Sequence, residues 1–186
     1  YAEATEMLDN AITQFQQVED TLGVAQCLRS LGGLAHMKNN YAEAAELLNN
    51  AMSLFQQIDN RRGIGGIADC LRLLGGIAHM KDNFAEAVEL LSNAMLLFQQ
   101  INDRLGVAEC LQGLGKISFL KGNNVEGRKA FSKAISLYED MNLKYKISEC
   151  QIVLQEVERC EQDLSDSELL TPSIDEDDLI YSDNLL

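Results

Sequence analysis

The sequence has 186 residues, of which 46% are hydrophobic, with one proline and no tryptophan, which fits one ordinary domain or a short array of repeats. Its longest apolar runs are only a few residues, so we expect no membrane insertion. The formal net charge of −14 argues against nucleic acid or an anionic membrane as a partner, because both bind basic protein surfaces.

Three stretches of the sequence align with one another and mark an internal repeat. They read "YAEATEMLDNAITQFQQVED", "YAEAAELLNNAMSLFQQIDN" and "FAEAVELLSNAMLLFQQIND", and a weaker copy, "NVEGRKAFSKAISLYEDMNL", follows. The intervening stretches "GVAQCLRSLGGLAHMKNN", "GIADCLRLLGGIAHMKDN" and "GVAECLQGLGKISFLKGN" also repeat. The copies begin 40, 43 and 40 residues apart, a period that is typical of a solenoid.

Both halves of the repeat unit are predicted to be helical. Apolar residues fall at spacings of three and four in the first half, as at Ala44, Leu48 and Ala51, and also in the second half, as at Leu28 and Leu31. Short polar breaks join the halves, so sequential helices should be antiparallel neighbours. In chain order, we expect helices over residues 1–18, 22–38, 41–58, 62–81, 84–101, 104–121, 124–140 and 143–161.

The repeat unit resembles the tetratricopeptide repeat. That family has a Leu-Gly pair in its first helix, which Leu31-Gly32 matches here. Its second helix carries A-x3-F and a further Ala, and Ala44, Leu48 and Ala51 follow this pattern with Leu in place of Phe. The long helices are similar to the forty-residue class of Pins-type adaptors and of NACHT and NB-ARC proteins. The resemblance implies an all-α solenoid of antiparallel helix pairs, wound as a right-handed superhelix.

The predicted domain organisation follows the phase of this repeat. Aligned with the family pattern, the sequence begins on the second helix of a repeat. Its last helix has Gln155 where the others have glycine, which favours a capping role. We therefore expect a helical array over residues 1–161 and an acidic tail over residues 162–186. The array divides into a partial repeat 1–20, repeats 21–60, 61–103 and 104–142, and a capping helix 143–161.

The stretch "RRGIGGIADC", residues 61–70, has the spacing G-x-G-x-x-[GA] of a dinucleotide-binding loop. That loop requires a preceding β-strand and an acidic residue about 20 positions later, whereas predicted helices flank this stretch. It also occupies the place of "TLGVAQC" and "RLGVAEC" in the neighbouring repeats, with three residues added. We therefore expect the insertion Ile64–Gly66 to extend a turn or the first turn of a helix, without binding a nucleotide.

The side chains that could suggest chemistry recur with the repeat. Cysteine on the apolar stripe acts as a small hydrophobe, and sulfurs one repeat apart are too far from each other for a zinc site. No nucleophile or carboxylate constellation recurs beside the histidines. We expect no catalytic residue, no metal and no cofactor, and the free thiols favour a cytoplasmic (intracellular) location. The residues in question are Cys27, Cys70, Cys110, Cys150, His36 and His79.

A tetratricopeptide solenoid lines its concave groove with the first helix of each repeat, so the resemblance implies a peptide-binding groove there. Arginines on the predicted groove face would supply positive charge, and methionines an adaptable apolar floor. Such a groove suits an extended or helical protein segment with acidic and apolar residues. The predicted groove residues are Gln26, Arg29, Gly33, His36, Met37, Asp69, Arg72, Gly76, His79, Met80, Glu109, Gln112, Lys116, Phe119 and Leu120.

The C-terminal part of the sequence differs in composition from the repeats. Residues 161–186 contain nine acidic residues and no Lys or Arg, together with Leu-Leu and Leu-Ile pairs. We expect a non-catalytic scaffold for protein–protein interactions. One alternative is an autoinhibited or self-associating module in which residues 166–186 dock on a concave repeat face. Another is a regulatory or sensor segment of a larger signalling NTPase.

Overall fold

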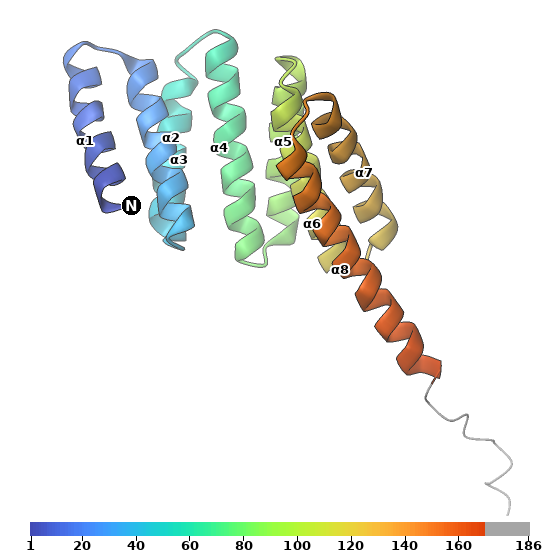
Figure 1. Ribbon diagram of the computed structural model, residues 1–186. Helices are drawn as coiled ribbons and strands as arrows, with labels where there is room; N and C mark the ends of the chain where they lie inside the picture. Colours follow the sequence, from blue (N-terminus) through green and yellow to red (C-terminus); the bar gives the residue numbers. More distant parts are fainter. Residues whose placement is uncertain (170–186) are drawn as a thin grey trace, which may run out of the picture. The chain divides into compact units, whose positions relative to one another are not determined.

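The computed structural model describes the backbone of residues 1–169 and the side chains of residues 1–163. The described residues form eight α-helices and no β-strand (Figure 1), which confirms the all-α class. None of these helices has both the length and the apolar content needed to cross a membrane. The helices are α1 (Ala2–Gln17), α2 (Thr21–Met37), α3 (Tyr41–Phe55), α4 (Arg61–Met80), α5 (Phe84–Gln100), α6 (Arg104–Leu120), α7 (Asn124–Asp140) and α8 (Lys144–Leu169).

Within the unit Tyr1–Cys150, each helix from α1 to α6 packs against the next, and consecutive helices run in opposite directions (Figure 1). We call α2, α4 and α6 the first helices, and α1, α3, α5 and α7 the second helices. The first helices also contact one another, α2 with α4 and α4 with α6, whereas no comparable contact joins the second helices of this unit. The first helices therefore form the inner layer of a solenoid and the second helices its outer layer.

Six of the seven connections between helices are three-residue linkers of one geometry. The middle residue has a positive φ, which ends the helix in a left-handed turn. The backbone N–H of the third linker residue donates to the carbonyl five positions earlier, as from Asp20 to Phe15 at 2.9 Å and from Asn40 to Ala35 at 2.9 Å. The middle residues are Glu19, Asn39, Asp82, Asn102, Gly122 and Asn142.

The connection between α3 and α4 differs, because it contains the three-residue insertion. Helix α4 has 20 residues, whereas α2 and α6 have 17, and the additional turn lies at its N-terminus. The Asn60 side chain caps this turn by accepting hydrogen bonds from the N–H groups of Arg62 at 2.8 Å and Gly63 at 3.3 Å. Because the insertion is absorbed before Ala68, the rest of α4 keeps the register of the other first helices. The prediction of an extended first turn is confirmed.

Helix α3 ends early, and the linker that follows it passes close to the start of α4. The sequence predicted a helix to residue 58, and this is wrong by three residues, because α3 ends at Phe55. A Cβ atom at Gly63 would lie 2.1 Å from the Ile58 carbonyl oxygen and 2.8 Å from that of Phe55. Only glycine allows the chain to pass so close, and the linker of residues 56–60 leaves the helical path at this approach.

Glycines also decide how closely the two layers approach. A Cβ atom at Gly66 would lie 2.3 Å from the Phe55 ring, and one at Gly106 would lie 2.4 Å from the Phe98 ring. Both phenylalanines are at most 2% exposed, so these helix crossings bury a large apolar area. The first turn of α8 has Lys146 at the same place in the repeat, and a lysine cannot admit an aromatic ring in this way.

Helix α8 extends past the predicted end of the array. It runs to Leu169, whereas the sequence predicted an end at residue 161. Its first residues, to Cys150, belong to the repeat body, and the chain from Gln151 onward forms a second unit. Part of the predicted acidic tail, residues 162–169, is therefore helical. Residues 170–186, which include most of the segment predicted to self-associate, lie outside the described residues.

Candidate functional site

The fifteen predicted groove residues lie on α2, α4 and α6, the three helices of the inner layer. Five of them are exposed, nine are half-buried, and Gln112 is buried. The exposed residues are Gln26, Met37, Met80, Lys116 and Leu120. The repeats thus place these side chains on neighbouring helices. Equivalent residues of different repeats nevertheless differ in their exposure and in the residues that they contact.

Six charged side chains form a line of alternating sign across the inner layer, which we call the ion-pair ladder. Arg29 on α2 bonds Asp69 on α4, although the two residues are 40 positions apart. Asp69 also accepts a hydrogen bond from Arg72, at 3.3 Å. In chain order, the ladder consists of Arg29, Asp69, Arg72, Glu109, Lys146 and Glu149.

The ladder continues through α6 to the start of α8. The Arg72 Nε atom lies 3.4 Å from Glu109 Oε2, which is close enough for an ion pair, but the N–H group is not aligned for a hydrogen bond. Lys146 Nζ lies 3.4 Å from Glu109 and 3.7 Å from Glu149. Three cations thus face three carboxylates, and the ladder has no net charge.

The ladder changes the electrostatics that the sequence predicted for this face. Arg29 and Arg72 were expected to offer positive charge to an acidic ligand, but both are paired with carboxylates of the chain itself. Lys116 is exposed and has no ion pair within residues 1–163. The available positive charge of the inner face therefore lies at Lys116 rather than at the arginines.

Three apolar side chains at the C-terminal ends of the first helices form an exposed apolar stripe. Met37, Met80 and Leu120 occupy the same place in successive repeats and are 60%, 54% and 62% exposed. A single exposed methionine is common on protein surfaces. Here, however, three successive repeats each expose one apolar side chain at the same place, which makes a row of apolar contact points. These three positions of the predicted groove are thus exposed apolar side chains on successive first helices.

The two histidines of the predicted set pack against aromatic rings of the second helices. The ring centroids of His36 and Tyr41 are 5.9 Å apart, and those of His79 and Phe84 are 6.0 Å apart. Burial lowers the pKa of His36 from its ordinary value, since a charged imidazole is disfavoured there. These contacts give both histidines a role in joining the helices of one repeat.

Phe119 and Gln112 of the predicted set also point toward α7. The Phe119 ring stacks on Phe131, with centroids 5.4 Å apart. The buried Gln112 side chain accepts a hydrogen bond from the Tyr138 hydroxyl at 3.1 Å. Sequence reasoning missed this bond, although the sequence carries a signal for it. In the third repeat, Tyr138 stands where the second repeat has Phe98, and Gln112 stands where it has Arg72. In this structure, Gln112 is buried and Phe119 is half-buried against α7.

The repeated cysteines are buried as predicted. Cys70, Cys110 and Cys150 are fully inaccessible, Cys27 is nearly so, and the thiols are free. Burial raises the pKa of Cys70 and of Cys110 to about 12, because a thiolate would be poorly solvated. Within the described residues, His, Cys, Asp and Glu side chains do not form a group of three that could hold a metal ion.

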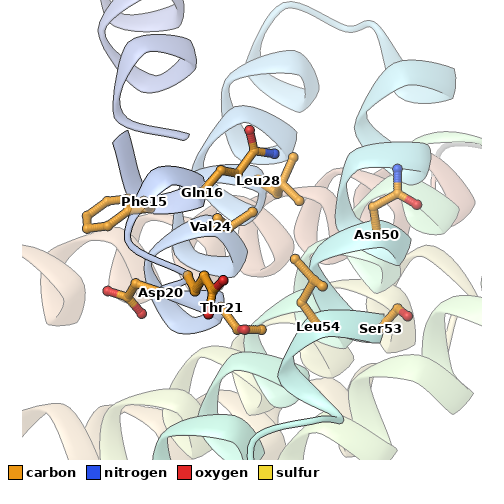
Figure 2. A pocket seen from close by; sticks show the side chains of 10 residues that line it. Phe15, Gln16, Asp20, Thr21, Val24, Leu28, Asn50, Ser53 and Leu54 are labelled. Carbon is orange, nitrogen blue, oxygen red and sulfur yellow. The ribbon is translucent and has the colours of Figure 1, made fainter. Parts of the chain in front are cut away.

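A pocket of about 580 Å³ lies between α1, α2 and α3 (Figure 2), and none of the predicted groove residues lines it. Side chains of Phe15, Val24, Leu28 and Leu54 supply its apolar lining. Polar groups of Gln16, Glu19, Asp20, Thr21, Asn50 and Ser53 supply the rest. Because α1 and α3 are second helices, this hollow opens beside the outer layer. The sequence pattern carried no signal for it, since it depends on how three helices meet.

Comparisons with known proteins agree with the repeat pattern. The family model of the tetratricopeptide repeat matches residues 1–57. Among curated proteins, none matches the sequence. Solved structures of low sequence identity share the fold, and at these identities the likeness speaks for the fold alone.

The crystal structure of BtubC from P. vanneervenii has 10% identity and a TM-score of 0.71, and the match covers 88% of this chain and 68% of that one. The apo form of RapI has 13% identity and a TM-score of 0.70, with 89% of this chain and 45% of that one covered. The N-terminal domain of stress-induced protein-1 (STI-1) from C. elegans has 17% identity and a TM-score of 0.51, with 70% and 97% covered. The chain therefore spans less than half the length of RapI.

Proposed function

We propose that the chain is a non-catalytic scaffold that binds a segment of a partner protein along its inner layer, because residues 1–57 match the tetratricopeptide repeat, whose repeats serve as scaffolds for protein interactions. The observation that supports this proposal best is the apolar stripe of Met37, Met80 and Leu120, one exposed apolar side chain per repeat. A partner segment with apolar residues at matching intervals would cover the stripe.

The chemistry of the inner layer indicates what such a segment carries. Fully burying a methionine or leucine side chain contributes about 1.5–3 kcal/mol, whereas an exposed ion pair contributes about 0–1 kcal/mol. Contacts with the stripe therefore dominate the affinity. The ion-pair ladder has no net charge and favours a segment without a strong charge of either sign opposite it. One acidic side chain near Lys116 would fix the orientation of the segment.

A selection experiment with peptides of random sequence tests this assignment. A displayed library of such peptides is selected against the full chain, and the affinity of the selected peptides is measured. The double variant Met37→Glu/Met80→Glu should weaken their binding at least tenfold. The matched control is Leu96→Glu on α5, because Leu96 is equally exposed, at 60%, but lies on an outer helix. Equal binding to the double variant and to the wild-type chain contradicts the proposal.

The hypothesis that residues 166–186 occupy the same layer makes a separate prediction. A chain that ends at Asp163 should then bind the selected peptides more tightly than the full chain, because the competing segment is gone. Equal affinities of the two chains would contradict this hypothesis, but they would not contradict the proposed binding site on the inner layer.

A further inference from the structure

The pocket between α1, α2 and α3 combines an apolar floor with a polar rim (Figure 2). The apolar side chains of its lining are half-buried, and we call them the floor; the exposed polar side chains around them form the rim. With a volume of about 580 Å³, the pocket can take an apolar group from the solvent side. The floor consists of Phe15, Val24, Leu28 and Leu54, and the rim of Gln16, Glu19, Asp20, Asn50 and Ser53.

The rim carries two carboxylates that the chain does not neutralise. Glu19 and Asp20 lie in the linker between α1 and α2, and the pocket lining contains no Lys, Arg or His. Neither carboxylate has an ion pair within residues 1–163. Asp20 Oδ1 accepts a hydrogen bond from the N–H of Gly23 at 3.0 Å, while its Oδ2 atom has no hydrogen-bond partner in this part of the chain. An apolar floor beside these carboxylates suits a ligand that carries both an apolar group and a cation.

The fold does not require a carboxylate at Glu19. This residue is the middle one of its linker and has φ 56°, and the other linkers of this geometry have Asn, Asp or Gly there. Those three residue types adopt a left-handed conformation more readily than glutamate does. The turn would therefore form at least as well with asparagine, so the negative charge at Glu19 is free to serve a ligand.

The corresponding places of the next two repeats have cations instead. Helix α2 begins with Thr21, whereas α4 and α6 begin with Arg61 and Arg104. On α7, Lys133 stands where α3 has Asn50. A cationic ligand would meet these basic side chains at the later places. Charge therefore distinguishes the pocket from the equivalent places along the array.

We infer that this pocket is a second binding site, for a segment of a partner protein in which an apolar residue neighbours a lysine or arginine. The apolar side chain enters the floor, and the cation lies beside Glu19 and Asp20. The exposed rim would leave much of a free small molecule in water, whereas a bound segment covers its own side chain, so a protein segment fits better. None of the predicted groove residues lines the pocket, so the inference is independent of the proposed function.

A displayed library of random peptides tests the chemistry of the ligand. It is selected against the full chain carrying Met37→Glu/Met80→Glu, in which the apolar stripe is disrupted. Peptides with a basic residue beside an apolar one should be enriched, and their affinity for the wild-type chain is then measured. Replacing the basic residue of the peptide by glutamine, or its apolar neighbour by glycine, should weaken binding at least fivefold.

The variant Glu19→Asn/Asp20→Asn tests the carboxylates with little change to the fold. Asn102 is the middle residue of a later linker, and Asn60 caps α4 as Asp20 caps α2. The variant should weaken the binding of the selected peptides at least fivefold. The matched control is Asp82→Asn, because Asp82 is also an exposed linker residue with a positive φ but does not line the pocket. It should leave the affinity unchanged.

The variant Asn50→Lys tests the opposite side of the rim, on α3. It adds the cation that Lys133 supplies at the equivalent place of α7, and it should also weaken binding at least fivefold. Asn49→Lys adds the same charge to the neighbouring exposed residue, which does not line the pocket, and should have a smaller effect. Circular dichroism checks that all variants remain folded.

Three results would overturn the inference. One is a selection without enrichment of basic and apolar neighbours. Another is an unchanged affinity of the selected peptides for either pocket variant. The third is displacement of the peptides by phenylethylammonium at an equal concentration, which would assign the pocket to a free organic cation instead of a protein segment.

Discussion

The hydrogen bond between Gln112 and Tyr138 joins α6 to α7, at places where the second repeat has Arg72 and Phe98. The Tyr138 hydroxyl is fully buried, and Gln112 is its hydrogen-bond partner. We expect Tyr138→Phe and Gln112→Leu each to lower the free energy of unfolding by about 1–3 kcal/mol, because each leaves a buried polar group without a partner. The double variant should lose much less than the sum. Urea denaturation measures the cycle, and additive losses would contradict this coupling.

The buried thiols make stability depend on alkaline pH. In the unfolded chain, Cys70 and Cys110 ionise near their ordinary pKa of 9.0, whereas in the folded chain their pKa is about 12. The stabilising effect is thus fully present below pH 9 and is lost as the pH rises toward 12. Each thiol should reduce the free energy of unfolding by about 1.4 kcal/mol per pH unit in this window.

Urea denaturation between pH 8 and pH 11 tests this dependence. The variant Cys70→Ala/Cys110→Ala should show a clearly shallower loss of stability with pH than the wild-type chain. Tyr138 is present in both chains, and burial also raises its pKa, so its contribution cancels in the comparison. Identical slopes would mean that the two thiols are not the groups responsible.

At the scale of the helices, two glycines should respond in opposite ways to the same change. Gly63→Ala should destabilise the protein by more than about 2 kcal/mol, because the new methyl group overlaps the Ile58 carbonyl oxygen. Gly33→Ala should stabilise α2 by about 0.5–1 kcal/mol, because no atom lies near its Cβ position and alanine favours helix. Thermal unfolding distinguishes the two, and a similar effect of both would contradict the described packing at Gly63.

Most helices could be predicted from the sequence, because the apolar spacing and the polar breaks repeat in every unit. The end of α3 could not, because the following linker accommodates an insertion and passes close to Gly63, which no periodic pattern reports. The residues of the groove face were proposed together from helical spacing, but the ion pairs between them were not predicted. The bond from Arg29 to Asp69 joins neighbouring repeats, and helical spacing within one helix does not show what the next helix places opposite.

At the scale of the whole array, the ion-pair ladder joins successive repeats. Asp69→Asn keeps the size of the side chain but removes a charge that two arginines share. Its charged groups are partly exposed, so we expect a loss of only about 1 kcal/mol in the free energy of unfolding, and less in 1 M salt. Asp59→Asn is the matched control, because Asp59 is exposed and outside the ladder. A loss that does not depend on salt would point to packing rather than charge.

The central claim, that partner segments bind along the inner layer, is tested most directly by the methionine methyl groups. Met37 and Met80 lie in the apolar stripe, whereas Met52 and Met95 are half-buried on the outer helices α3 and α5. Methyl-labelled full chain is titrated with a peptide from the displayed library and followed by NMR. We predict that the Met37 and Met80 signals shift and saturate together, while those of Met52 and Met95 stay in place. Shifts confined to Met52 and Met95 would contradict the claim.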